Sequence, residues 1–391
     1  MDFEWLQEHD MMRQAVKDIA SDYDEEYWRE VRAERRVPRE LYDDLADGGW
    51  LGIPIPEEYG GQGMGILEVV LMMQALGEER VWEISVSDLI FSMVFGGVSV
   101  TKNGTEAQKE ELLPGIINGE RWSLGLTEAE AGLNTTNITT VAEPDGSEYV
   151  INGQKMWTSG IDEADKLLLL ARTTPKDETS SRARGLTQFI VDDPSNTDGI
   201  EYSELPLDIY YPDRTYQVNI DNLRVPEENV LGEVDEGLYQ IFDMLNVERM
   251  TAGTGIWAAG MYCIDKAVEY ANQREVFDGP IGQYQGIQHP LADSYAELES
   301  AKGTLERAAW QFDNDVGDVG EISNVANLQA GKAAWNACEA AMQTFGGSSV
   351  SAEIGIAAAW ATVRHLRIAP VSEEMIRNHI AQHSLGLPRS Y

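Results

Sequence analysis

SLGLTEAEAGLNTTNITTVAEPDGSEYVINGQKMWTSG, residues 123–160, contains two segments whose composition is typical of a binding site. LTEAEAG at 126–132 is a strand end that runs into small residues, and KMWTSG at 155–160 places two hydroxyls after a tryptophan. Apolar and polar residues alternate between them, and the dipeptides Asp145-Gly146 and Asn152-Gly153 are turn signals, the second being the strongest short hairpin signal. The pattern therefore predicts a β-meander that brings the two segments onto neighbouring strands.

Outward from these segments, the chain divides into three parts. Residues 1–120 repeat apolar side chains at helical spacing, and Ala-rich helical runs follow residue 236, whereas residues 121–235 contain short strands separated by Gly, Pro, Asp and Asn turns. The expected strands include Lys166–Ala171, Leu186–Val191 and Val218–Arg224, and the expected long helices are Leu238–Arg274, His289–Asp315, Ser323–Thr344 and Ser351–Arg364. The sequence thus predicts an α+β chain with an N-terminal helical domain at 1–120, a middle β-domain at 121–235 and a C-terminal four-helix bundle at 236–391.

The chain is strongly acidic. It has 391 residues, with 67 acidic and 29 basic side chains and a formal net charge of -38. Nucleic acids and anionic membranes are polyanions, so this charge argues against both as partners. The acidic residues are spread among aromatic and aliphatic ones rather than gathered in a disordered tail. We interpret them as a self-repelling surface of the kind that high salt screens, and we expect a salt-adapted, halophilic protein.

Cysteine usage and the N-terminus bear on the compartment. Cys263 and Cys338 form no CxxC pair and lie in helical contexts, so we expect two buried thiols in a reducing cytoplasm. The opening MDFEWLQEHD has neither the basic region nor the apolar run of a signal peptide. No segment reads as long and apolar enough to span a bilayer, and the five histidines show no metal-ligand spacing. We therefore expect a soluble cytoplasmic protein without a metal site.

Four further motifs follow along the chain in the order of a known family. They are PEEYGGQGM at 56–64, LRVPEENVLG at 223–232, REVFDGPIGQYQGIQ at 274–288 and QTFGGSS at 343–349. Together with the two segments above, they make the sequence resemble the acyl-CoA dehydrogenase family over nearly its whole length. The resemblance implies FAD as cofactor, an acyl-CoA substrate and a homo-oligomer, usually a tetramer of paired dimers.

The resemblance also assigns flavin contacts to the two segments. The main-chain amides of Leu126 and Thr127, with the Thr127 hydroxyl, would hydrogen-bond the pyrimidine edge. Trp157 would flank the isoalloxazine ring, and Ser159 would bond near N5. A flavin that accepts a hydride needs such a flat apolar partner, fixed donors and exclusion of water. Leu133 departs from the family pattern, which has a serine there that binds the flavin diphosphate or seats the ligand.

Two later motifs match the pieces that reach across a dimer interface to the neighbouring subunit's FAD in the family. By resemblance they comprise Arg274, Phe277, Gln285, Gln343, Gly346 and Gly347. A guanidinium suits a diphosphate because its planar fork binds two oxygens at once. FAD binding would then require at least a dimer.

The family's reaction needs a carboxylate that removes the proton next to a thioester carbonyl, in a dry site that raises its pKa. The family places this Glu either in a C-terminal Tyr-Glu-Gly-Thr segment or beside an Arg on the first long helix of the bundle. The C-terminal counterpart here, RIAPVSEEM, reaches only Glu373 by an ungapped count. Glu248, directly before Arg249, fits the helix position, and Ala252 and Gly255 on the same face would leave room for an acyl channel. We favour Glu248 and keep Glu373 as the alternative.

The resemblance implies FAD-dependent α,β-dehydrogenation of an acyl-CoA thioester to the trans-2-enoyl-CoA, in fatty acid β-oxidation, with electrons passed to an electron-transfer flavoprotein. In this hypothesis Glu248 takes the α-proton, and the flavin, backed by Trp157 and Ser159, receives the β-hydride. Two alternatives stay open. One is an oxidase, in which oxygen reoxidises the flavin, and the other is a non-catalytic acyl-CoA-binding subunit of the same fold.

Overall fold

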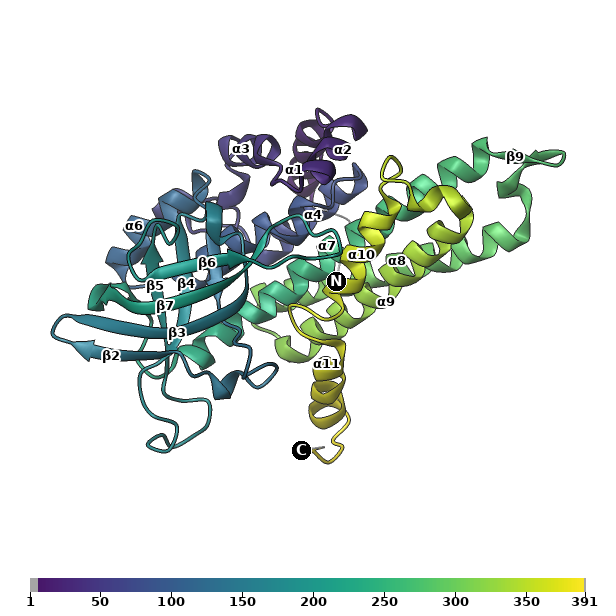
Figure 1. Cartoon of the computed structure of the whole chain (residues 1–391). Helices are drawn as coiled ribbons and strands as arrows, with labels where there is room; N and C mark the ends of the chain where they lie inside the picture. Colours follow the sequence, from purple (N-terminus) through teal and green to yellow (C-terminus); the bar gives the residue numbers. More distant parts are fainter. Residues whose placement is uncertain (1–5, 390–391) are drawn as a thin grey trace.

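The computed structural model describes residues 6–389. Figure 1 shows strands β2 to β7 gathered at one end of the molecule and long helices extending toward the other, with the first helices above them. The N-terminal helices are α1 (Gln7–Ala20), α2 (Glu25–Glu34), α3 (Arg39–Asp47), α4 (Ile66–Glu78), α5 (Ser99–Asn103) and α6 (Glu106–Ile117). α6 begins with a capping box, in which Thr105 and Gln108 each accept a hydrogen bond from the other's backbone amide. The Gln108 amide group also donates to the Glu228 and Val230 carbonyls, so this cap fastens α6 to the strand region.

An apolar stretch, Ile84–Asn103, lies between α4 and α6. It comprises the 3-10 turn η3 (Ile84–Val86), the π-helix η4 (Ile90–Val98) and α5. It is the one helical segment within residues 6–389 that is long and apolar enough to cross a membrane, and 89% of its most apolar window is buried inside the fold. The expectation that no segment has this length and apolarity is therefore wrong. The run is apolar because it packs against α7 and β1 in the interior.

The middle of the chain forms an eight-stranded sheet. Its strands are β1 (Trp122–Gly125), β2 (Val141–Asp145), β3 (Glu148–Ser159), β4 (Lys166–Arg172), β5 (Leu186–Asp192), β6 (Ile200–Glu204), β7 (Thr215–Pro226) and β8 (Val230–Leu231). Neighbours follow the order β6-β7-β3-β2-β4-β5-β8, and β1 pairs in parallel with β4. The three strands expected from the sequence are confirmed as β4, β5 and β7. β4 is buried along almost its whole length, which explains its unbroken apolar run.

The expectation of a hairpin at Asn152-Gly153 is wrong. Residues Glu148–Ser159 form one strand, which pairs with β7 on both sides of a bulge between Ile151 and Gly153. The Asn152 side chain accepts a 2.8 Å hydrogen bond from the backbone amide of Asn222 on β7. A long antiparallel partner therefore overrides the local turn signal, and the extra residue becomes a bulge. The other expected turn, at Asp145-Gly146, is confirmed by the β2–β3 hairpin.

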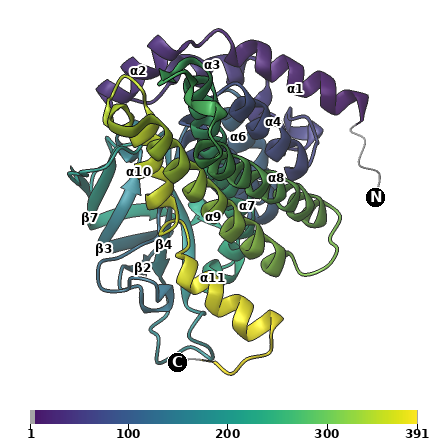
Figure 2. The same ribbon diagram turned by 90° about the vertical axis from the view of Figure 1, so that its right-hand side faces the viewer.

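The C-terminal part is a helical bundle. Its helices are α7 (Gly237–Gln273), α8 (Gln285–Asp313), α9 (Val319–Phe345), α10 (Ile356–Leu366) and α11 (Glu373–His379), and a hairpin of β9 (Glu275–Val276) and β10 (Gly279–Pro280) joins α7 to α8. Figure 2 shows α7, α8 and α9 side by side, with α11 projecting away from them. The four expected helices are present, and the expected buried thiols are confirmed, with Cys263 and Cys338 sulfurs 3.5 Å apart between α7 and α9.

The core explains how these parts fit together. One hydrophobic cluster runs from the N-terminal helices into the bundle and includes Trp82, Trp257 and Leu298. A second cluster lies within the sheet and includes Leu169 and Phe189. The helical parts therefore pack as one body, and the sheet has a core of its own. Of the candidate site residues, Leu126 and Thr127 follow β1, Trp157 and Ser159 lie at the end of β3, and Glu248 lies in α7.

Candidate active site

The two segments singled out in the sequence lie side by side just beyond the end of β1. The Met156 amide donates a 2.8 Å hydrogen bond to the Thr127 carbonyl, and Lys155 Nζ donates to the Leu126 carbonyl at 3.3 Å. The segments are not partners in a strand ladder, because β1 pairs with β4. They meet through one main-chain hydrogen bond and one lysine rather than through the expected meander.

Trp157 lies on a bulge where β3 and β7 shift register between Lys155 and Thr158. Its φ angle is 61°, a left-handed conformation that bulky residues rarely adopt and that is concentrated at functional sites. The bulge turns the indole outward, so that 54% of the residue's surface is exposed. A flat apolar ring is therefore exposed on the residue that follows Met156, whose amide contacts the Thr127 carbonyl.

A buried ion pair beneath Trp157 was not foreseen from the sequence. Lys155 Nζ lies 2.9 Å from Glu128 Oε1, and both residues are almost fully buried. Glu128 also accepts hydrogen bonds from the Thr139 and Thr140 amides. Burial would raise the pKa of Glu128, but Lys155 and the Thr140 hydrogen bond outweigh it and lower this pKa to about 2. Burial lowers the pKa of Lys155 to about 8, and Glu128 opposes that change. The pair fixes the two segments against each other.

Ser159 is held from two sides. Its hydroxyl lies 2.9 Å from the Thr215 hydroxyl on β7, and its carbonyl accepts a 2.8 Å hydrogen bond from the Ser123 hydroxyl on β1. The residue is half-buried at the end of β3. Its position at the end of β3 is thus set by two other strands, β1 and β7, that are distant from it in sequence.

Glu248 lies in α7 with only 6% of its surface exposed. Its Oε2 has no hydrogen-bond partner within residues 6–389. Desolvation raises the pKa of Glu248 to about 8, and the charge of Arg249 only partly opposes this. Consecutive helix residues point in different directions, and the Arg249 guanidinium donates to the Asn246 side chain instead. Glu248 is therefore a buried carboxyl with a raised pKa and one oxygen without a partner among the described residues.

Glu373, the alternative base, differs from Glu248 because both of its carboxylate oxygens are paired with arginines. Its Oε1 lies 2.5 Å from Arg367 Nε, and its Oε2 lies 2.5 Å from the Arg377 guanidinium. Burial would raise the pKa of Glu373, but the hydrogen bonds and charges of the two arginines lower it. This carboxylate is committed to two guanidiniums at the start of α11, which makes it a poor proton acceptor.

The room expected along α7 beyond Glu248 is not open at Gly255. A Cβ atom on Gly255 would lie 2.6 Å from the Ser85 carbonyl oxygen and 2.7 Å from Val86. The glycine therefore allows η3 to pack directly on α7. Tyr211 fixes this contact, because its hydroxyl donates to the Val86 carbonyl at 3.0 Å. The interpretation of Gly255 as part of an acyl channel is wrong, because the space serves helix packing.

The residues expected to reach a neighbouring subunit all lie at the far end of the bundle. They are exposed, and they comprise Arg274 and Phe277 around the β9–β10 hairpin, Gln285 at the start of α8, and Gln343, Gly346 and Gly347 at the end of α9. Stacking of Tyr270 on Phe345, with ring centroids 4.2 Å apart, joins the ends of α7 and α9. Figure 1 shows this hairpin at the opposite end of the molecule from β2 and β3. Within one chain, these residues and Trp157 are therefore not brought together.

Models of a single family match three consecutive parts of the chain. The N-terminal, middle and C-terminal domains of acyl-CoA dehydrogenase match residues 6–120, 123–221 and 235–385. The chain belongs to the acyl-CoA dehydrogenase family. It is an oxidoreductase of this family with FAD as its cofactor. The resemblance inferred from the sequence motifs is thereby confirmed.

Individual relatives of this acyl-CoA dehydrogenase span its whole length. Acyl-CoA dehydrogenase FadE12 of Mycobacterium tuberculosis strain H37Rv is 35% identical over 387 residues, which cover 98% of each chain. The solved glutaryl-CoA dehydrogenase in complex with glutaryl-CoA superposes with a TM-score of 0.92 at 28% identity, covering 100% of this chain and 98% of that one. Butyryl-CoA dehydrogenase from Megasphaera elsdenii superposes with a TM-score of 0.87 at 25% identity, covering 96% and 98%.

Proposed function

We propose that this acyl-CoA dehydrogenase family member removes a proton and a hydride from the α- and β-carbons of an acyl-CoA thioester, giving the trans-2-enoyl-CoA. Glu248 is the base in this proposal. The observation that carries it is the state of the Glu248 carboxyl, which is buried, has a raised pKa and has one oxygen without a partner among the described residues. A weak carbon acid needs a base with these properties.

The comparison of the two candidate carboxylates favours Glu248. A general base must bind the substrate proton more tightly than an ordinary carboxylate does, and it must have a lone pair free to receive it. The raised pKa of Glu248 meets the first condition, and its unpartnered Oε2 meets the second when the carboxyl is ionised. Two arginines instead stabilise the ionised form of Glu373, which weakens its affinity for a proton. In the balanced reaction the α-proton passes to Glu248 and the β-hydride leaves as the second hydrogen. Bound FAD supplies the acceptor for that hydride.

The residues around Trp157 suit the cofactor. The exposed indole of Trp157 offers an apolar surface for a planar ring. The left-handed backbone conformation of Trp157 is strained, which favours a functional role for this residue. The 126–127 backbone is held against the two residues that precede Trp157, by the Met156 amide and by the Lys155 ammonium. We therefore propose that Leu126, Thr127, Trp157 and Ser159 hold the flavin ring. These contacts would also exclude water from its reacting edge.

We propose that a second copy of the chain completes the FAD site. Arg274 and Phe277 lie around an exposed hairpin, and Phe277 has 92% of its surface exposed, which is unusual for a phenylalanine in a folded chain. Gln343, Gly346 and Gly347 are exposed at the same end of the bundle. A guanidinium delivered there would suit the diphosphate of the neighbouring subunit's FAD. A homodimer, or a dimer of dimers, is the assembly that this proposal requires.

We propose an electron-transfer flavoprotein as the electron acceptor. The test is turnover in the presence of such a protein compared with turnover in air alone. Rapid release of hydrogen peroxide under air would support the oxidase alternative instead. Purified protein without a flavin spectrum would support the non-catalytic alternative.

The direct test of the proposed reaction is anaerobic bleaching of the bound flavin. A panel of acyl-CoA thioesters of different length and branching is added to the purified holoprotein, and flavin absorbance is followed in a single turnover. Glu248→Gln should retain FAD and lower the bleaching rate by about 10²–10⁴-fold, the usual contribution of a general base. Glu373→Gln is the matched control, because it also neutralises a buried carboxyl. Normal bleaching in Glu248→Gln, or loss of bleaching only in Glu373→Gln, would contradict the assignment.

A further inference from the structure

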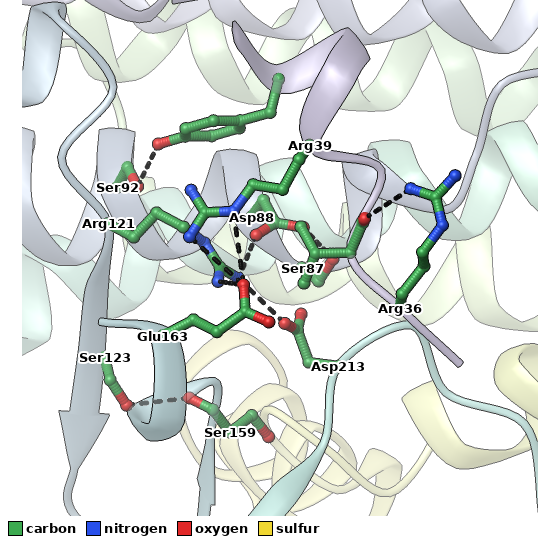
Figure 3. A network of polar contacts seen from close by, with 12 residues as sticks. Arg36, Arg39, Ser87, Asp88, Ser92, Arg121, Ser123, Ser159, Glu163 and Asp213 are labelled. Carbon is green, nitrogen blue, oxygen red and sulfur yellow. Dashed lines mark hydrogen bonds and ion pairs between the residues drawn. The ribbon is translucent and has the colours of Figure 1, made fainter. Parts of the chain in front are cut away.

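A buried cluster of charges lies behind Ser159 (Figure 3). At its centre is Arg121, whose side chain is 2% exposed. Its guanidinium pairs with Asp213 and Glu163, each at 3.0 Å, and forms a shorter contact with Asp88. Arg39 adds a second cation, which pairs with Glu163 at 3.2 Å. One guanidinium thus contacts three carboxylates, of which Asp88 and Asp213 are buried and Glu163 is 43% exposed.

These three ion pairs tie together the segments that surround Ser159. Arg121 immediately precedes β1, and Ser123 on that strand donates to the Ser159 carbonyl at 2.8 Å. Asp213 immediately precedes the segment of Thr215, whose hydroxyl lies 2.9 Å from that of Ser159. Both strand ends that touch Ser159 are therefore anchored to the same guanidinium.

The turn that follows Ser159 packs directly on the cluster. Gly160 has a φ angle of 70°, and its amide donates to the Arg214 carbonyl at 2.9 Å. A Cβ on Gly160 would lie 3.5 Å from Asp213 Oδ1 and 3.6 Å from the Arg121 guanidinium. The turn then runs through η6 (Ile161–Glu163), so that Glu163 brings its end back to Arg121. The position of Ser159 is thus set from both sides by one side chain.

Stability alone does not account for this arrangement. Buried ion pairs often contribute no more than well-packed apolar side chains of the same volume, because desolvation offsets the attraction. Here three acids converge on one guanidinium, and Asp213 Oδ2 has no partner within residues 6–389. Desolvation and the nearby Asp88 raise the pKa of Asp213, whereas Arg121 opposes them. Burying these charged groups costs free energy. In return, the planar Arg121 guanidinium, with its several donors, fixes the positions of three carboxylates at once.

We propose that Arg121 is a positioning residue for the reaction, acting through Ser159: it holds the Ser159 hydroxyl at the edge of the flavin ring that receives the hydride. The inference rests on the proposed function for its kinetic consequence. The effect of Arg121 on the absorption of the bound flavin can be measured without turnover. A displacement of about 1 Å at a reacting centre can lower the rate by about 10²-fold. A residue that does not touch the flavin can therefore affect the rate as much as one that does.

The test compares two conservative changes of buried arginines. Arg121→Lys keeps the charge but loses the fork that reaches three carboxylates. Arg32→Lys is the matched control, because Arg32 is 6% exposed and pairs with Glu83 at 2.8 Å and Glu25 at 2.7 Å, away from Ser159. For each holoprotein we would measure the unfolding temperature, the visible absorption band of oxidised FAD, FAD affinity and the rate of anaerobic bleaching at saturating acyl-CoA.

Both variants should unfold at lower temperature than the wild type. Only Arg121→Lys should shift the flavin band and slow bleaching, by about 10–100-fold, with little change in the substrate concentration for half-saturation. Combining Arg121→Lys with Ser159→Ala should slow bleaching little more than Ser159→Ala alone, because both changes remove the same contact. An unshifted flavin band with an unchanged rate in Arg121→Lys, or additive effects of the two changes, would overturn the proposal.

A milder variant covers the case in which Arg121→Lys does not fold. Glu163→Gln removes the charge of one of the three partners, at a side chain that is 43% exposed, and it should move the band and the rate in the same direction by a smaller amount. A normal band and rate in Glu163→Gln would then overturn the inference. Failure of every acyl-CoA to bleach the wild type would instead refute the proposed function, and the flavin band and FAD affinity would still test Arg121.

Discussion

Lys155 and Glu128 form an ion pair of 2.9 Å in which neither side chain is more than 4% exposed. The pair joins β3 to the segment that follows β1, so it holds the Trp157 bulge against the 126–127 backbone. Lys155→Met would leave Glu128 buried without its cation, and we expect a loss of about 3–5 kcal/mol in the free energy of unfolding, measured by denaturant titration. Lys166→Met is the control, because Lys166 pairs with Asp192, which is 60% exposed, and its loss should cost about 0–1 kcal/mol. A similar cost for the two variants would contradict the account of the pair.

Glu248 should make stability fall as pH rises. Burial raises the pKa of the native carboxyl to about 8, whereas the pKa of the unfolded carboxyl is near 4.5. The native state therefore binds more protons between these values, and stability is lost across this window by up to about 5 kcal/mol. Glu248→Gln has no such proton, so it should be more stable than the wild type at pH 8.5 and approach it near pH 5.

The opposite sign is expected at Glu373. The pKa of this carboxyl is lowered in the native state, so its contribution to stability is present above the unfolded value and is lost as pH falls through the native one. Glu373→Gln should therefore be less stable than the wild type near pH 7, by chemical denaturation at fixed salt. If both Gln variants changed stability in the same direction at pH 8.5, the contrast drawn between the two carboxyls would be wrong.

Phe277 should matter to assembly rather than to folding of one chain. With 92% of its surface exposed, its removal costs an isolated chain almost nothing. Phe277→Ser should shift the protein toward monomers in light-scattering measurements and lower its FAD content. Met11→Ser, at a residue of α1 that is 67% exposed, is the control and should change neither. A dimer with full FAD content in Phe277→Ser would refute the role of the hairpin.

The surface charge makes stability depend on salt. A net charge of -38 repels itself, and the Debye length falls from about 10 Å at 0.1 M to about 3 Å at 1 M. The unfolding temperature should therefore rise by several degrees between about 0.1 M and 1 M KCl. Calorimetry at constant pH would measure it. An unfolding temperature that is flat or falling over this range would contradict the expectation of salt adaptation.

Local signals predicted much of the fold. Apolar spacing located the long helices. The Asn152-Gly153 signal failed because β7, more than sixty residues away, pairs along the whole of β3 and turns the expected hairpin into a bulge. Gly255 was read as open space for a related reason, since η3 fills it from a distant part of the chain. Both errors come from partners that a local window does not contain.

The sequence by itself determined the family, the order of helices and strands, and the choice of Glu248 as the residue to examine, because spacing and motif are local properties of the chain. Only the tertiary structure decided the chemical state of that residue, since desolvation depends on everything packed around it. The same holds for the charge cluster behind Ser159, in which Arg121 meets Asp88, Glu163 and Asp213 at separations of 33, 42 and 92 residues. Contacts between charged residues at such separations leave no periodic pattern in the sequence. They can be identified only in the folded structure.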